Sequence, residues 1–233
     1  MRNKFRYKGS ERWCAVCESS SSLFLPVGFN PLEAPRKDAR CPMCGSVERH
    51  RLLVTFLKDR TDLFDGKPKD FLHIAPEKCF VRMFSRAAGK GYLTADLMAE
   101  DVMEKMDITD IKKPDNSFDV IYCSHVLEHV DDDRKAMREF FRVLKPKGWA
   151  VLNVPVTADT TFEDPTVTDP VERNRLFGQY DHVRKYGPDY EDRLVEAGFT
   201  VARVTSKELM KPEEIVRHGL SNVITGDVFY CTK

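Results

Sequence analysis

The stretch that decides the fold runs from Asp115 to Pro155 and reads DNSFDVIYCSHVLEHVDDDRKAMREFFRVLKPKGWAVLNVP. Two apolar runs, Phe118–Cys123 and Trp149–Val154, predict buried strands within it. Residues 131–144 predict a helix between these strands, because aspartates stand at its start and the sequence Lys-Pro-Lys-Gly follows its end. A strand, a helix and a strand in this order predict two parallel strands of an α/β sheet.

The same alternation continues on both sides of this stretch. The further elements that we expect are a strand over residues 69–75, a helix over 77–88, strands over 92–96 and 106–108, a helix over 186–197, and strands over 199–204 and 228–231. Gly89 directly follows the first of these helices, as glycine commonly does at a helix end. Strands that alternate with helices predict an α/β fold whose mostly parallel sheet carries helices on both faces.

The carboxyl ends of the strands are where open α/β sheets bind their ligands. Asp96 ends the strand over 92–96, where a carboxylate is placed to accept two hydrogen bonds from a ribose diol. Such a carboxylate serves NAD or S-adenosylmethionine equally well, but the sequence lacks the G-x-G-x-x-G motif of dinucleotide-binding proteins. A strand-end acid that faces only solvent is the alternative.

Two cysteine pairs near the N-terminus predict a metal site. Cys14 and Cys17 form one C-x2-C motif, and Cys41 and Cys44 form the second. Four thiolates at this spacing are typical of structural zinc with tetrahedral coordination. A redox pair would need a strand–helix context that neither motif has, and structural disulfides are rare in a reducing cytoplasm. We therefore expect a closed, structural zinc site rather than a catalytic one.

The zinc motifs suggest a division of the chain. We expect a zinc ribbon over residues 1–45, a linking helix over 46–65 that Ser46 caps, and an α/β domain over 66–233. A zinc ion would replace the hydrophobic core that so short a ribbon cannot build by itself. The sequence shows no signal peptide and no membrane-spanning apolar stretch, so we expect a cytoplasmic protein.

Three stretches together resemble the class I S-adenosylmethionine-dependent methyltransferases, in particular their type 11 group. They are YLTADL at residues 92–97, DITD at 107–110 and the run 115–155, and the resemblance covers roughly residues 69–205. The cysteine pairs, followed by GSVERHR and LHIAPEKC, look like a bacterial subgroup with a ribbon in front of this domain. The resemblance implies a Rossmann-like, seven-stranded sheet and S-adenosylmethionine as the cofactor.

The resemblance also implies roles for individual residues at the cofactor site. Asp96 would bind the ribose, Asp107 and Ile108 would hold the adenine, and Ser124 with His125 would line the meeting point of cofactor and acceptor. The full set of cofactor-binding candidates is His73, Ala75, Pro76, Glu77, Asp96, Leu97, Asp107, Ile108, Ser124 and His125.

One loop departs from the family pattern. The family has acid-x-Gly-x-Gly where this chain has the sequence HIAPE at 73–77, so Ala75 and Glu77 replace the two glycines. We expect Ala75 to permit close approach of the cofactor with a negative φ, and Glu77 to supply a carboxylate for the ammonium group. A loop that no longer supports catalysis is the alternative.

Three residues after the strand 118–123 are candidates for the chemistry. His125, Glu128 and His129 share one face of a helical turn. One histidine could act as a general base toward the acceptor. Alternatively, the three could bind a second, divalent metal ion, which some quinone-pathway O-methyltransferases are thought to hold at similar positions. In a third interpretation, Glu128 and His129 only form local contacts.

Residues 157–185 form a long polar segment without a clear helical period, which we interpret as a substrate loop or lid. Its sequence Asp181-His182 offers a base next to a carboxylate, so His182 joins the catalytic candidates. Arg184 could bind an acidic acceptor.

The leading functional hypothesis is methyl transfer to an oxygen or nitrogen atom of a small molecule, such as a sugar, polyketide-like or lipid-linked acceptor. The first alternative is an RNA base methyltransferase, with Lys4, Arg6, Lys8 and Arg12 on the phosphates and Phe5, Tyr7 and Trp13 stacked on bases. Equal totals of basic and acidic residues, 37 of each, argue against it. The second alternative is an interaction protein with a catalytically silent fold.

Overall fold

The computed structural model describes residues 5–28, 35–221 and 226–233. Lys4, one of the basic residues considered above, lies outside them. The chain divides into two compact units. The first comprises residues 1–66, 78–83 and 204–228, and the second comprises residues 67–77, 84–203 and 229–233. The boundaries predicted from the sequence, at residues 45 and 65, stay a prediction.

A seven-stranded sheet organises the second unit, with the strand order β12-β13-β9-β8-β5-β6-β7. Its strands are β12 (Thr200–Val204), β13 (Val228–Thr232), β9 (Leu144–Asn153), β8 (Phe118–Ser124), β5 (Phe71–Ile74), β6 (Tyr92–Asp96) and β7 (Glu104–Lys105). The strands from β9 to β7 pair in parallel, while β13 pairs antiparallel with β9. The predicted α/β class and seven-stranded Rossmann-like sheet are thereby confirmed.

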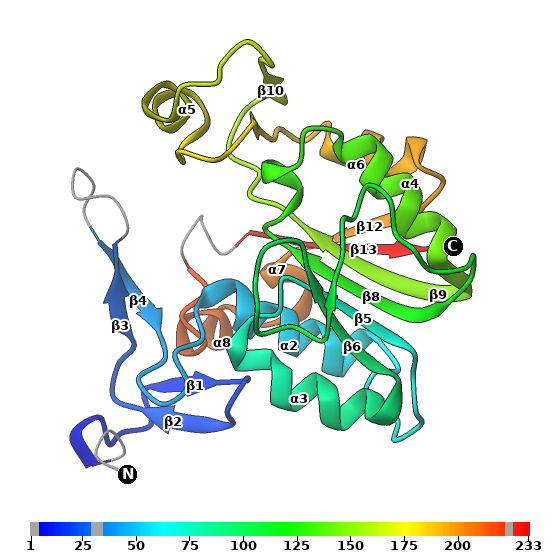
Figure 1. The fold of residues 1–233 in the computed structure, drawn as a ribbon. Coiled ribbons are helices and arrows are strands. Elements are labelled where there is room, and N and C mark those ends of the chain that lie inside the picture. Colours follow the sequence, from blue (N-terminus) through cyan, green and yellow to red (C-terminus); the bar gives the residue numbers. More distant parts are fainter. Residues whose placement is uncertain (1–4, 29–34, 222–225) are drawn as a thin grey trace. The chain divides into compact units, whose positions relative to one another are not determined.

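The sheet has two differently packed faces because side chains alternate along each strand. On one face, Leu72 and Ile121 join the core together with α4 (Asp133–Val143) and α6 (Tyr190–Glu196). Figure 1 shows both helices on that side of the sheet. On the other face, the rings of His73 and Tyr122 pack with Phe84 from the C-terminal half of α3 (Lys78–Ala88). The carboxyl ends of the parallel strands are thus held in place by cores on both sides.

The edge strand of the sheet differs from its prediction. The sequence predicted a strand over 106–108, but β7 covers Glu104–Lys105 and pairs with the end of β6. Met106 and Ile108 are buried by their side chains in the loop that follows, which explains their apolar character. Burial of a loop was therefore mistaken for strand pairing.

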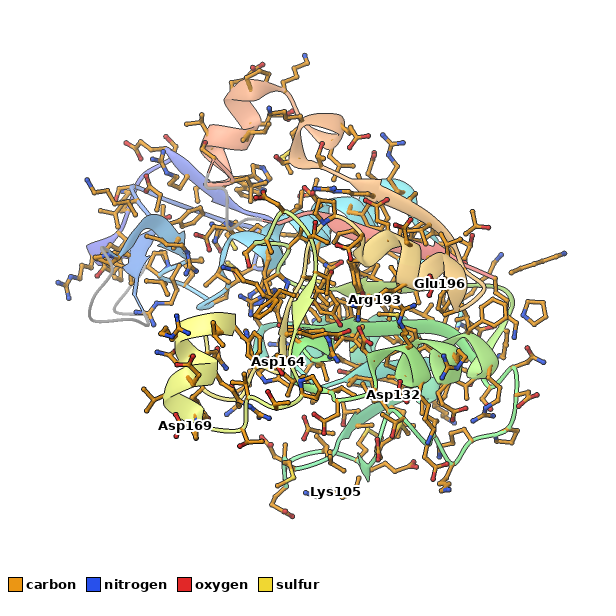
Figure 2. The ribbon with its side chains drawn as sticks, turned by 90° about the horizontal axis from the view of Figure 1, so that it is seen from above. Lys105, Asp132, Asp164, Asp169, Arg193 and Glu196 are labelled. Atoms are coloured by element: carbon orange, nitrogen blue, oxygen red, sulfur yellow. The ribbon has the colours of Figure 1, made fainter. Side chains whose placement is uncertain are left out.

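The segment 157–185 also differs from its prediction, because it contains a helix. Helix α5 (Pro170–Phe177) begins after Asp169, whose carboxylate accepts hydrogen bonds from the amides of Val171 and Glu172. Gly178 ends it in the left-handed region with a φ of 91°. Two short strands, β10 (Phe162–Glu163) and β11 (Arg184–Lys185), pair antiparallel at the ends of the segment. Figure 2 labels Asp169 at the start of this helix.

Two small hairpins lie next to the four paired cysteines in the first unit. Strand β1 (Arg12–Cys14) pairs with β2 (Ser19–Ser21), and β3 (Leu25–Val27) pairs with β4 (Arg36–Arg40). Helix α2 (Glu48–Arg60) follows, with α7 (Ser206–Leu209) and α8 (Pro212–Arg217) in the same unit. Ser46 does not cap α2 as predicted, since Val47 occupies that position and its amide donates to His50.

Among the residues that the structure describes, no helix combines the length and the apolar character that crossing a bilayer requires.

Candidate functional site

A cavity of about 650 Å³ opens at the carboxyl ends of β5, β6 and β8 in the second unit. Its lining residues are Ile74, Ala75, Asp96, Leu97, Met98, Met106, Asp107, Ile108, Thr109, His125, Val126, His129, Val130, Asp131, Asp132 and Asp181. Ligand-binding cavities commonly have this size. The cavity therefore lies where the sheet topology places a ligand, and it includes six of the residues predicted to bind a cofactor: Ala75, Asp96, Leu97, Asp107, Ile108 and His125.

The charge of this lining is one-sided. It contains five aspartates, and none of the described residues in it is a lysine or an arginine. Such a cavity attracts cations and repels phosphate groups, because like charges at close range cost free energy.

Asp96 stands at the end of β6 with one carboxylate oxygen already used. Its Oδ1 accepts hydrogen bonds from the amides of Met98 and Ala99, both at 2.7 Å. These bonds hold the carboxylate in one orientation at the cavity wall and leave Oδ2 for a ligand. An oxygen in this place can accept a hydrogen bond from a hydroxyl group, and the binding of a ribose by Asp96 stays a prediction.

The loop after β5 adopts a strained backbone. Ala75 has a φ of 47°, in the left-handed region, while its amide donates to the carbonyl of Ala95 at 2.9 Å. The prediction of a negative φ is therefore wrong: the alanine keeps a conformation that glycine adopts without a steric penalty. The backbone consequently borders the cavity here although the glycine is missing.

Four of the predicted cofactor residues lie away from the cavity wall. His73 is fully buried, and its Nδ1 lies 2.8 Å from the hydroxyl of Tyr92. Burial lowers the pKa of His73 to about 4, so the ring is neutral. Glu77 accepts a hydrogen bond from the Tyr122 hydroxyl at 2.9 Å. Pro76 and Ser124 complete this group, which the structure does not bring to the cavity lining.

The catalytic candidates do come together. His125 has a φ of 56°, and its Nδ1 lies 3.3 Å from Oε1 of Glu128. Glu128 and His129 belong to a short 3-10 helix, η2 (Leu127–His129), that follows β8. His125 and His129 line the cavity, while the Glu128 side chain is buried behind them. A non-glycine residue held at a positive φ is a common feature of functional sites.

His182 of the loop joins this group. Its ring packs edge-on against His129, with centroids 4.7 Å apart. Ligand atoms of Glu128, His129 and His182 all lie within 4.8 Å of one another. Asp181 does not orient its neighbour His182, because its Oδ2 instead lies 3.3 Å from Nδ1 of His129. The Nδ1 of His182 lies 3.2 Å from the carbonyl of Phe177.

Arg184 holds the loop against η2. This buried side chain donates hydrogen bonds to the carbonyls of Leu127, Val130 and Asp131. The amide of Val183 donates to the carbonyl of Glu128 at 2.9 Å. The prediction that Arg184 binds an acidic acceptor is therefore wrong, because its guanidinium group is used within the protein.

A network of charged side chains connects Arg184 to helices α4 and α6. Arg193 of α6, labelled in Figure 2, pairs with Asp133 at 2.9 Å and with Glu163 at 3.1 Å. Glu163 also pairs with Arg184 at 2.8 Å, and the Tyr186 hydroxyl donates to Asp133 at 2.6 Å. Burial alone would raise the pKa of Glu163, but the two arginines hold it below its usual value.

The four-cysteine cluster of the first unit has the geometry of a tetrahedral metal site. Its Sγ atoms lie within 4.8 Å of one another, with Cys14 and Cys44 at 3.7 Å and Cys17 and Cys41 at 3.8 Å. Four sulfurs at about 2.3 Å from a zinc ion lie about 3.8 Å apart, so the distances fit. All four cysteines are free of disulfides.

The turns after the two cysteine pairs support the same interpretation. The residue that follows each pair, Glu18 or Gly45, has a positive φ. The amide of Met43 points at the Cys41 sulfur, at 3.4 Å.

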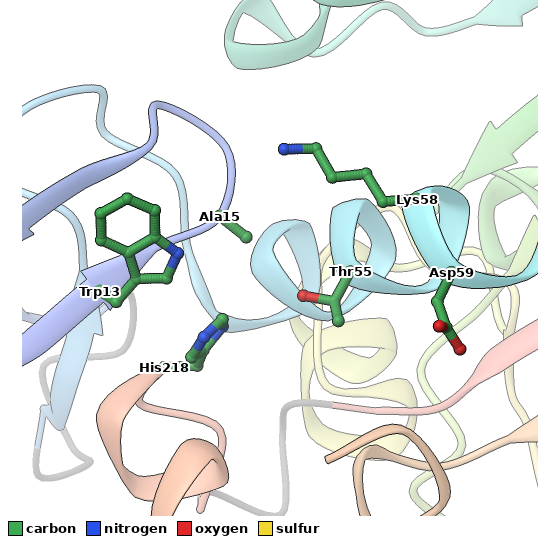
Figure 3. Close-up of a pocket in the computed structure, with 6 residues that line it drawn as sticks. All are labelled: Trp13, Ala15, Thr55, Lys58, Asp59 and His218. Carbon is green, nitrogen blue, oxygen red and sulfur yellow. The ribbon is translucent and has the colours of Figure 1, made fainter. Parts of the chain in front are cut away.

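A second, smaller cavity of about 300 Å³ lies in the first unit. Figure 3 shows the residues that line it: Trp13, Ala15, Thr55, Lys58, Asp59 and His218. It gathers no cluster of convergent polar groups comparable with that of the larger cavity, which therefore remains the candidate site.

Part of the chain that forms this cavity also matches a known protein family. Residues 81–152 match a family model described as a methyltransferase domain. They include β6, β8, η2 and α4, and hence Asp96 and the residues around His125.

Two curated relatives match parts of the chain. The uncharacterized methyltransferase YcgJ of Bacillus subtilis (strain 168) is 38% identical over 72 residues, which are 31% of this chain and 27% of that protein. Phosphoethanolamine N-methyltransferase 1 of Arabidopsis thaliana is 34% identical over 101 residues, 42% of this chain and 18% of that protein. The chain thus matches less than a third of the length of either relative.

A solved structure shares the fold. The S-adenosylmethionine-dependent methyltransferase of Mesorhizobium loti superposes with a TM-score of 0.50 over 71% of this chain and 90% of that one, at 18% sequence identity.

Proposed function

We propose that the protein transfers a methyl group from S-adenosylmethionine to an oxygen or nitrogen atom of a small-molecule acceptor, and the match of residues 81–152 to a methyltransferase domain supports this. The single observation that carries the proposal is the acid-lined cavity at the carboxyl ends of the strands, with Asp96 on one side and His125 on the other.

The charge of the cavity suits this cofactor. S-adenosylmethionine carries a sulfonium, an ammonium and a carboxylate group and is a cation overall, and the described lining holds five aspartates and neither a lysine nor an arginine. We assign the ribose to Oδ2 of Asp96 and the adenine to the buried side chain of Ile108 with Asp107 beside it. When bound, the cofactor supplies an electrophilic methyl group.

His125 is our candidate general base. The contact of its Nδ1 with the buried Glu128 leaves Nε2 as the nitrogen that can take a proton from the acceptor. The acceptor's lone pair forms a bond to the methyl carbon while the carbon–sulfur bond breaks, and alignment supplies much of the rate. His129 and His182 would shape the acceptor side of the cavity.

The same lining supports a small, neutral or cationic acceptor over RNA. A nucleic acid brings phosphates, which basic side chains normally neutralise, whereas this cavity offers aspartates. The Arabidopsis relative acts, by its name, on phosphoethanolamine, a small molecule whose phosphate this acidic lining would not favour, so we do not carry its substrate over to this chain. We further propose that Cys14, Cys17, Cys41 and Cys44 hold a structural zinc ion, in keeping with their sulfur distances.

The test is calorimetric binding of S-adenosylhomocysteine to the wild type and to Asp96→Asn. An asparagine keeps the Oδ1 acceptor for the amides of Met98 and Ala99, so the turn should survive. It replaces Oδ2 by a donor and so removes a charged hydrogen bond worth about 1.5–3 kcal/mol. We expect affinity to fall about 10- to 100-fold.

Asp101→Asn is the matched control, because Asp101 is an exposed acid in the same loop that does not line the cavity. Equal affinities of the Asp96 variant and the wild type would contradict the cofactor assignment. Absence of binding to the wild type would favour the silent interaction protein instead.

A further inference from the structure

We propose that Glu128, His129 and His182 bind one divalent transition-metal ion at the wall of the cavity, with the loop histidine as the third ligand. Their ligand atoms already lie within 4.8 Å of one another. Tetrahedral ligands at about 2.1 Å from a zinc ion lie about 3.4 Å apart, so closure of the site needs a shift of at most about 1.4 Å in the longest of these separations.

Each of the three residues has one polar atom engaged and one left for an ion. Nδ1 of His129 lies 3.3 Å from Oδ2 of Asp181, and Nδ1 of His182 lies 3.2 Å from the carbonyl of Phe177. Both oxygens can only accept, so the tautomer with its proton on Nδ1 suits each ring, and in that tautomer Nε2 is bare and can bind an ion. Metal-bound histidines characteristically donate their other N–H to such an acceptor.

Glu128 likewise has one oxygen atom in contact with a neighbour and one oxygen atom left for an ion. Its Oε1 lies 3.3 Å from His125, whereas Oε2 is buried and has no hydrogen-bond partner among the described residues. Glu128 is only 1% exposed. A buried carboxylate oxygen without a partner costs several kcal/mol, and a metal ion would remove that cost. This orphaned atom is the observation that separates the site from an ordinary cluster of polar groups.

The donor set indicates the kind of ion. Two imidazoles and one carboxylate suit Zn²⁺, Fe²⁺ or Mn²⁺ better than Mg²⁺ or Ca²⁺, which prefer oxygen ligands throughout. Three protein ligands leave at least one coordination position open, as in catalytic rather than structural sites. His129 lines the cavity, so the open position can receive an oxygen or nitrogen atom of the acceptor.

The metal site forms only when the segment 157–185 packs against η2, because His182 comes from that segment. His182 and Glu128 are held together by the Val183 amide, which donates to the Glu128 carbonyl, and by Arg184, which donates to the carbonyls of Leu127 in η2 and of Asp131 after it. The role of the ion in orienting the acceptor rests on the proposed function, whereas its binding does not.

The experiment is a titration of the full-length protein with Co²⁺, followed by visible absorption, after dialysis against citrate to empty a weak site. Cobalt bound by nitrogen and oxygen lacks the thiolate charge-transfer band that cobalt in the four-cysteine site would show, so the two sites are read separately. We expect one cobalt ion per chain without that band. His182→Ala should weaken its binding at least 100-fold, and Asp181→Asn should weaken it about 10- to 100-fold, because Asp181 contacts Nδ1 of the ligand His129.

Two further variants test whether the cobalt binding is specific to this site. His218→Ala, in the first unit, should bind cobalt like the wild type. Glu128→Gln should lose cobalt binding, yet its metal-free form should melt no lower than the metal-free wild type, because a buried charge is removed. Wild type that binds no such cobalt, or a His182 or Glu128 variant that binds it normally, overturns the proposal. Calorimetry with S-adenosylhomocysteine on the same samples reports on the proposed function independently.

Discussion

Arg184→Ala tests whether one buried side chain fastens the loop to the site. The wild-type guanidinium donates to three backbone carbonyls of residues 127–131 and is 3% exposed. Alanine would remove this donor from all three carbonyls, although that of Leu127 would keep the Val130 amide at 3.3 Å and the Tyr186 hydroxyl at 3.4 Å. Asp133 would keep Arg193 at 2.9 Å and the Tyr186 hydroxyl at 2.6 Å, so no isolated charge would remain there.

The expected loss follows from these contacts. A hydrogen bond with a charged partner contributes about 1.5–3 kcal/mol, and removal of one partner of a buried ionic network costs about 3–5 kcal/mol. We therefore expect Arg184→Ala to lower the free energy of unfolding by about 3–5 kcal/mol. The ion pair with Glu163 adds little to this value, because the Glu163 side chain is 41% exposed. This is a large part of the stability of a typical domain.

Urea unfolding followed by circular dichroism measures the loss, and hydrogen exchange locates it. The Val183 amide, bonded to the Glu128 carbonyl, should lose its protection before the central strands do. Arg175→Ala is the matched control: that arginine is 66% exposed, pairs only within α5, and should cost less than about 1 kcal/mol. A loss below about 1 kcal/mol for Arg184→Ala, with unchanged exchange at Val183, would refute the reasoning.

Two further predictions concern the strained loop and the cysteine cluster. Ala75→Gly should raise the free energy of unfolding by about 0.5–1 kcal/mol, because glycine adopts a φ of 47° without the steric penalty of a Cβ atom. Thermal unfolding measures this change. A melting temperature below that of the wild type would show that Ala75 is not strained. Cys41→Ser should release the zinc ion and unfold the residues of the ribbon, because the cluster replaces a core there; zinc content and hydrogen exchange over residues 5–28 and 35–45 measure this. Full zinc content in that variant would show that the four thiols are not one site.

The elements with strong local signals could be predicted from the sequence. The apolar runs at 92–96 and 118–123 became β6 and β8 with nearly the predicted bounds, since continuous burial leaves a continuous apolar pattern. The aspartates before α4 include its N-cap, Asp132. The same kind of signal was missed at α5, where Asp169-Pro170 and Gly178 mark a helix start and end.

The sequence by itself therefore determined the α/β class, the pairing of cysteines into one cluster, and the position of Asp96 and His125 at the ends of strands. These features depend on residue spacing and on burial pattern, which are local. Only the tertiary structure decided that Asp181 faces His129, that Arg184 lies inside the protein, and that His182 meets Glu128. These contacts join residues about fifty positions apart in the sequence, and the carbonyl of Leu127 that Arg184 binds is a group that every residue carries, so spacing and composition do not predict them.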